Sequence, residues 1–131
     1  MREALAAGRL VALPRFCQAT GKYEAARIEV EGRDLETGRF GIREPRPTCA
    51  PVALNQLDLV LVPGVAFAPD GRRLGRGRGY YDRLLSTVRG VRCGVAAEWQ
   101  VIPALPALPH DEWVDCILTP LRWIACRQRA V

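Results

Sequence analysis

The chain has 131 residues, 49% of them hydrophobic, and its 19 basic and 14 acidic side chains give a formal net charge of +5. This length predicts a single domain over residues 1–131 with enough apolar side chains for a packed core. Because the sequence has no apolar run of the roughly 20 residues that a membrane span needs, no signal-peptide core and no zinc-type spacing among its five cysteines, we expect a cytoplasmic protein with reduced thiols and no membrane partner.

The N-terminal third begins with a predicted helix and strand. Residues 1–7 are mostly good helix formers, and Gly8 suits a C-terminal cap. The short apolar run 10–13 ends at Pro14, which is typical of a buried strand.

Less regular sequence follows. Residues 23–30 predict a second strand. Residues 31–51 are rich in glycine, proline and charge, and we expect a loop there.

The strongest strand pattern lies at residues 57–62. It is apolar at successive positions and is followed by Pro63-Gly64, as expected for a central parallel strand buried on both faces. Asp70-Gly71 signals a turn, and residues 80–88 carry apolar side chains at helical spacing.

Three further strands are expected near the C-terminus, at residues 91–97, 114–119 and, pairing at an edge, 123–126. Prolines at every third position from 103 to 109 predict an extended surface connection. The fold class is therefore α/β with a mostly parallel sheet.

A glycine-rich and arginine-rich loop stands between the strand and the helix. Residues 72–83 hold five arginines and one acid, whereas the remaining residues hold 14 basic and 13 acidic side chains. Gly75, Gly77 and Gly79 alternate with arginines, so backbone N–H groups can converge on an anion while guanidinium groups bind phosphate oxygens. The order of strand, loop and helix is where α/β proteins bind phosphates.

The residues alone leave alternatives open. Alternating glycine and arginine also occurs in disordered RNA-binding segments, which would make this chain a nucleic-acid-binding module. Tyr81 shares the apolar stripe of the helix, which favours a core position. Asp82 could bind a metal or only cap the helix, and Asp111 alone reads as a solvated loop residue.

The stretch 58–67 (DLVLVPGVAF), Gly71 and the stretch 73–82 (RLGRGRGYYD) together resemble the signature of the 5-formyltetrahydrofolate cyclo-ligase family. Flanking pieces also match in order, at residues 8–15 (GRLVALPR), 40–45 (FGIREP), 94–97 (GVAA), 110–115 (HDEWVD) and Thr119. The similarity runs from about residue 8 to Thr119, so it is more specific than a bare glycine motif.

The resemblance implies a three-layer, Rossmann-like sheet with helices on both faces. It also implies conversion of 5-formyltetrahydrofolate to 5,10-methenyltetrahydrofolate, with ATP as co-substrate, Mg²⁺ as cofactor and no nucleic acid as partner. The implied ATP-binding residues are Arg73, Leu74, Gly75, Arg76, Gly77, Arg78, Gly79, Tyr80 and Tyr81. The implied folate-binding residues are Arg76, Gly77, Arg78, Gly79 and Tyr80. Catalytic roles fall to Arg76, Arg78 and Tyr80, and Mg²⁺ binding falls to Asp82 and Asp111.

The resemblance also implies a start several tens of residues earlier, so we expect this sequence to lack the first helix and strand of the family. The expectation is therefore an N-terminally incomplete domain with impaired turnover, or a relative that binds nucleotide without catalysis. The family type is a monomer, and an exposed strand edge would favour self-association of the shorter chain.

Overall fold

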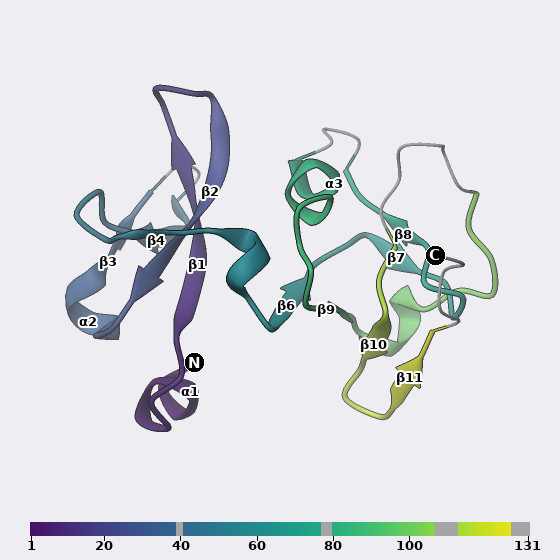
Figure 1. Ribbon diagram of the computed structural model, residues 1–131. Coiled ribbons are helices and arrows are strands. Elements are labelled where there is room, and N and C mark those ends of the chain that lie inside the picture. Colours follow the sequence, from purple (N-terminus) through teal and green to yellow (C-terminus); the bar gives the residue numbers. More distant parts are fainter. Residues whose placement is uncertain (39–40, 77–79, 107–112, 127–131) are drawn as a thin grey trace. The chain divides into compact units, whose positions relative to one another are not determined.

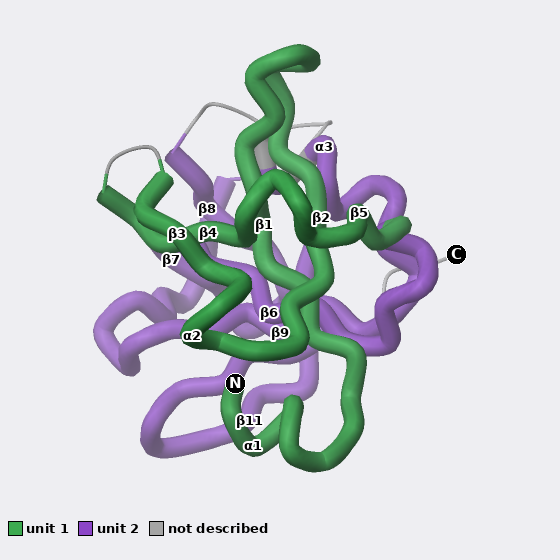
Figure 2. Tube along the Cα trace, turned by 90° about the vertical axis from the view of Figure 1, so that its left-hand side faces the viewer, with its two compact units in different colours: residues 1–53 green, residues 54–131 purple. Residues whose placement is uncertain are grey.

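The computed structural model describes residues 1–38, 41–76, 80–106 and 113–126. These residues form two compact units, Met1–Ala53 and Leu54–Val131 (Figure 2). We describe each unit by itself, and the single domain stays a prediction. No helix in the described ranges is long and apolar enough to cross a membrane.

The first unit is built on an antiparallel hairpin, in which β1 and β2 pair over their full length from Val11↔Ile28 to Cys17↔Lys22 (Figure 1). The sheet order is β1-β2-β5, and β3 and β4 form a separate antiparallel pair. The elements of this unit are α1 (Arg2–Ala6), β1 (Val11–Cys17), β2 (Lys22–Ile28), α2 (Glu31–Asp34), β3 (Leu35–Thr37), β4 (Arg43–Pro45) and β5 (Pro51–Val52).

The start of the chain follows the sequence pattern only in part. Helix α1 lies where it was expected, and Gly8 has the positive φ of 76° that suits a residue after a helix end. The expected strand end at Pro14 is wrong, because β1 continues to Cys17. Pro14 is tolerated since β1 lies at the edge of its sheet, where a missing N–H donor need not cost a ladder bond. The run 10–13 is also not fully buried, as Leu10 is 47% exposed.

A buried arginine connects the hairpin to the segment after β4. The guanidinium of Arg15 donates from Nε and Nη2 to Glu24 Oε1, at 3.0 and 2.7 Å. Its Nη1 donates to the carbonyl oxygens of Arg46 and Cys49, at 2.7 and 2.9 Å. These bonds order part of the 31–51 segment, which also holds α2 and three short strands, so the expected loop is wrong there.

The second unit contains a mixed four-stranded sheet of order β11-β10-β9-β6. Strands β6, β9 and β10 are parallel, with Val60 opposite Arg92 and Ile117 opposite Gly94, and β11 pairs antiparallel with β10. Its elements are η2 (Leu54–Gln56), β6 (Leu59–Val62), β7 (Ala66–Phe67), β8 (Arg73–Leu74), α3 (Tyr80–Leu85), β9 (Val91–Val95), η3 (Glu98–Gln100), β10 (Cys116–Leu118) and β11 (Trp123–Ala125). The α/β class, the three C-terminal strands and the edge pairing of β11 are confirmed.

Strand β6 corrects the prediction of a central strand buried on both faces. It lies at the end of the sheet order, and Leu59 and Leu61 are 55% and 59% exposed. The alternate side chains Val60 and Val62 contribute to the core. Continuous apolar sequence thus predicted the strand but not its surroundings. Helices on both faces stay a prediction.

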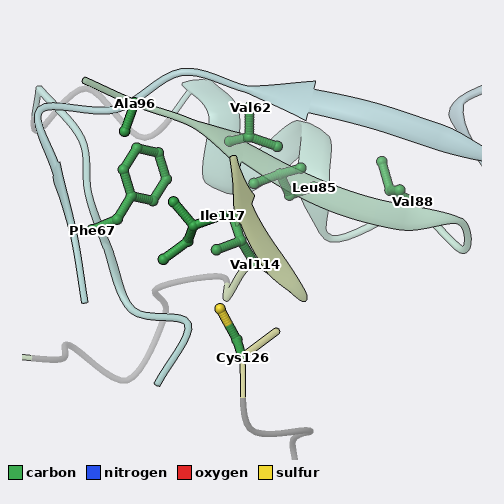
Figure 3. Close-up of a cluster of buried hydrophobic side chains, with 8 residues drawn as sticks. All are labelled: Val62, Phe67, Leu85, Val88, Ala96, Val114, Ile117 and Cys126. Carbon is green, nitrogen blue, oxygen red and sulfur yellow. The ribbon is translucent and has the colours of Figure 1, made fainter. Parts of the chain in front are cut away.

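The core of the second unit lies on the side of the sheet that α3 covers. Figure 3 shows Phe67 beside Ala96 and Ile117, with Leu85 of α3 next to Val62. Phe67 is fully buried, and its ring lies so close to Gly94 that a Cβ built there would be 2.6 Å from Cε1. A glycine in the middle of β9 is therefore needed where this ring crosses the strand.

We expect Gly94→Ala to lower the free energy of unfolding by about 1–3 kcal/mol, because the added methyl group overpacks a buried ring. All three tryptophans lie in the second unit, so urea unfolding followed by tryptophan fluorescence reports on it. Phe67→Leu should relieve the contact. The double variant should therefore lose less stability than the two single losses combined, and strictly additive losses would contradict this account.

Candidate functional site

The candidate site lies at the edge of the sheet where the parallel strands end. Because β6, β9 and β10 run in the same direction, their carboxyl ends at Val62, Val95 and Leu118 share one edge. Ligands of open α/β sheets bind at this edge. The segments that follow β6 and β9 therefore supply the candidate side chains.

The glycine-rich loop does not follow β6 directly, because the β7–β8 hairpin comes between them. Ala66 pairs with Leu74 and Phe67 with Arg73, and the N–H of Val65 donates to the carbonyl of Leu74 at 2.8 Å. The start of the loop at Gly75 is thus positioned by a strand pair. The expected order of strand, loop and helix holds, and the connection between the strand and the loop, with its turn at Asp70-Gly71, is a pair of short strands.

The turn expected at Asp70-Gly71 closes this hairpin. Asp70 Oδ1 accepts the N–H of Arg72 at 3.0 Å, and Gly71 has a φ of 104°, in the region that favours glycine. The carbonyl of Gly71 accepts the N–H of Val114 at 2.9 Å. The tip of the hairpin is therefore fixed to the chain that enters β10.

Arg73 holds the start of the loop against the end of β6. Its Nε donates to the carbonyl of Pro63 at 2.7 Å, and its guanidinium lies 5.3 Å from the centre of the Tyr81 ring. A Cβ on Gly75 would lie 3.0 Å from Arg73 Nη1, so the backbone of Gly75 runs beside this cation. Arg73 therefore contacts the protein on both sides of the loop start, and its implied role in ATP binding stays a prediction.

Arg76, the next arginine along the loop after Arg73, has an exposed side chain. Leu74 is 44% exposed and Gly75 is half-buried, so this part of the predicted ATP site is open to solvent. The remaining predicted loop residues Gly77, Arg78 and Gly79 lie outside the described residues.

The helix after the loop supplies the other predicted side chains. Tyr80 is the first residue of α3, and Tyr81 is half-buried against the core cluster, which confirms its expected core position. The helix ends at Leu85 rather than Val88. The side chains of Tyr80 and Asp82 lie outside the described part of the structure, as does Asp111, so the predicted metal pair stays a prediction. The described residues include no group of three metal-binding side chains.

A second anchored segment, at η3, was missed by the sequence interpretation. Gln100 Oε1 accepts the N–H of Ala97 at 2.8 Å, and Nε2 of the same side chain donates to the carbonyls of Gly64 and Val65, at 3.1 and 3.3 Å. This amide ties the segment after β9 to the segment after β6. Polar residues directly after a parallel strand were the available signal.

Glu98 connects the same segment to the turn between β10 and β11. Its carboxylate accepts from the hydroxyl of Thr119 at 2.8 Å and pairs with Arg122 Nη2 at 2.6 Å. The hydrogen bond from Thr119 and then that from Arg122 hold the pKa of Glu98 below its ordinary value. Two turns at the carboxyl edge are therefore joined by a charged hydrogen bond.

Two buried thiols of this unit, Cys116 and Cys126, are poor candidates for nucleophiles. Burial, reinforced by a hydrogen bond with Cys93, raises the pKa of Cys116 to about 12, and burial raises that of Cys126 to about 11. All five cysteines of the chain are free thiols.

A family model described as the 5-formyltetrahydrofolate cyclo-ligase family matches residues 1–120. A probable 5-formyltetrahydrofolate cyclo-ligase of Caenorhabditis elegans is 32% identical over 130 residues, which cover 90% of this chain and 63% of that protein. The 5-formyltetrahydrofolate cyclo-ligase of Mycolicibacterium smegmatis is 38% identical over 93 residues, which cover 69% of this chain and 48% of that protein.

A solved structure is also similar. The NMR structure of Aquifex aeolicus 5,10-methenyltetrahydrofolate synthetase matches with a TM-score of 0.84 and 35% identity, covering 99% of this chain and 64% of that chain. This chain therefore spans less than two thirds of the length of each of these three relatives.

We expect Glu98→Gln to lower stability at neutral pH and to reduce its loss in acid. A carboxylate with a lowered pKa in the folded state contributes stability above its unfolded pKa, near 4.5, and this contribution is lost as the pH falls through the folded pKa. The measurement is the melting temperature of both proteins from neutral pH down to about pH 3. Glu3→Gln, at an exposed position of α1, is the control. Parallel acid profiles for wild type and Glu98→Gln would contradict the assignment.

Proposed function

This chain belongs to the 5-formyltetrahydrofolate cyclo-ligase family, and we propose that it acts in the ATP-dependent conversion of 5-formyltetrahydrofolate to 5,10-methenyltetrahydrofolate. The observation that carries this proposal is the anchored start of the glycine–arginine loop. Arg73 Nε donates to the carbonyl of Pro63 at 2.7 Å, and the backbone of Gly75 lies beside the Arg73 guanidinium. The next residue, Arg76, is exposed. An anchored loop start followed by an exposed arginine suits the binding of a nucleoside triphosphate.

The chemistry asks mainly for positioning and charge stabilisation. A formamide oxygen is a poor leaving group until the γ-phosphoryl group of ATP is transferred to it, and ADP is released in this transfer. The neighbouring folate nitrogen then attacks the activated carbon, and the ring closes as phosphate departs. In this scheme Arg76 and Arg78 stabilise negative charge on the transferred group, and Tyr80 provides a flat surface for the folate.

Mg²⁺ would be held by few protein ligands. Asp82 lies in the first turn of α3, immediately after the loop, and Asp111 is the second proposed ligand. Hard carboxylate oxygens together with phosphate oxygens are the donor set that Mg²⁺ prefers. When bound, the ion would neutralise charge on the β- and γ-phosphates.

Nucleic-acid binding by the same loop is the competing function, and the family match does not favour it. Salt distinguishes the two. Binding to several backbone phosphates weakens steeply with salt because counterions are released. Binding of Mg²⁺–ATP by the proposed site should instead depend on the metal.

We expect Mg²⁺–ATP to raise the melting temperature and Arg76→Ala to weaken ATP binding by roughly 10- to 100-fold, because a hydrogen bond to a charged group contributes about 1.5–3 kcal/mol. Calorimetric titration gives the affinity. Arg89→Ala removes an equally charged exposed side chain outside the loop and should leave the affinity for ATP unchanged.

The folate reaction is followed in the same samples by the absorbance of the methenyl product with and without ATP. A folded protein that bound neither Mg²⁺–ATP nor 5-formyltetrahydrofolate would overturn the proposed function. Equal effects of Arg76→Ala and Arg89→Ala would overturn only the role of Arg76.

We expect Asp82→Asn to lower the affinity for Mg²⁺ in the presence of ATP while the protein remains folded, since asparagine keeps the shape of aspartate and loses its charge. Titration of Mg²⁺ at fixed ATP measures this. If Asp82 only favours the start of α3, the metal dependence will be unchanged and stability will fall by about 0.3–1 kcal/mol.

A further inference from the structure

Trp99 is a large aromatic side chain that is 79% exposed at the carboxyl edge of the sheet. It lies in the middle of η3, the short turn after β9. We propose that Trp99 is a stacking surface for the purine ring of the nucleotide whose phosphates bind the glycine–arginine loop. This inference rests on the proposed function and adds a residue that recognises the base.

Three backbone segments place Trp99 near the loop. The segment after β9 lies beside β7, because Phe67 bridges Val101 in parallel and its carbonyl accepts the N–H of Ile102 at 2.8 Å. On its other side β7 pairs with β8, with Phe67 opposite Arg73. Neighbouring strands lie about 4.8 Å apart, so the two outer segments run about 10 Å apart.

Closer to the sheet edge, residues 64–65 likewise lie between the segment after β9 and the segment that leads into the loop. Gly64 and Val65 accept hydrogen bonds from Gln100 on one side, and Val65 donates to Leu74 on the other. Trp99 therefore lies next to Gln100, which binds one side of the 64–65 segment. Gly75 and Arg76 directly follow Leu74, which binds the other side. A nucleoside triphosphate is an extended molecule with a planar ring at one end and phosphates at the other, so it can reach both.

The turn that carries Trp99 is held on both sides of this residue. Glu98 is fixed by Thr119 and Arg122, at 2.8 and 2.6 Å, and Gln100 is fixed by Gly64. The backbone that presents the ring is thus ordered before any ligand binds. Preorganisation reduces the entropy lost on binding, and flat aromatic side chains stack on bases of any sequence.

The experiment compares Mg²⁺–ATP with Mg²⁺–tripolyphosphate, which has the phosphates without the base, by calorimetric titration. Trp99→Ala should weaken ATP binding by roughly 5- to 100-fold, the range expected for loss of one stacking contact, and leave tripolyphosphate binding within about twofold. Trp99→Phe keeps an aromatic ring and should retain most of the ATP affinity. Trp123→Ala is the matched control, because Trp123 is also exposed but lies in β11, at the opposite end of the sheet order from β6.

Three outcomes would overturn the inference: unchanged ATP affinity in Trp99→Ala, equal loss of ATP and tripolyphosphate affinity, or a loss confined to 5-formyltetrahydrofolate, which would assign the ring to the pterin. Each leaves the proposed function standing, because wild type still binds ATP. A folded wild-type protein that binds no nucleotide would overturn both.

Discussion

The packing of Phe67 is the constraint on which the second unit depends. Its ring is fully buried in the core and crosses β9 at Gly94, while its backbone pairs with Arg73 on one side and bridges Val101 on the other. One residue therefore joins the sheet, the hairpin before the loop and the segment after β9. Any displacement of this ring would shift both sides of the candidate site together, because packed interiors transmit strain.

The arginines of the loop region have different tasks, which charge alone could not distinguish. Arg72 lies 5.2 Å from the centre of the Trp113 ring and donates to the carbonyl of Leu105 at 2.8 Å. Arg73 is bound to Pro63, whereas Arg76 is exposed. A local excess of positive charge thus combines cations that hold the fold with cations available for a ligand. Counting charges overestimates the number available to bind phosphate.

The sequence predicted those parts of the structure in which local pattern and environment agree. Strands β9, β10 and β11 and the turn at Gly71 follow from apolar runs and turn chemistry. The prediction that β6 is buried on both faces is wrong. An apolar run shows that a strand can be buried on both faces, but it does not show which neighbours cover the strand. Strands β3, β4 and β5 have two or three residues each, too few for a periodicity to be visible.

The site was predicted as a motif but not as an arrangement. A glycine and arginine pattern identifies a segment able to bind phosphate. The roles of Glu98 and Gln100 become visible only when β9 lies between β10 and β6, because Glu98 has its partners after β10 and Gln100 has its partners after β6. The β7–β8 hairpin is a second part of the arrangement that the motif could not predict. Because β7 and β8 stand between the end of β6 and Gly75, the loop does not inherit its position from the strand before it. Its position depends on the contact of Arg73 with Pro63, so a cation that the motif predicts to bind the ligand also holds the loop in place.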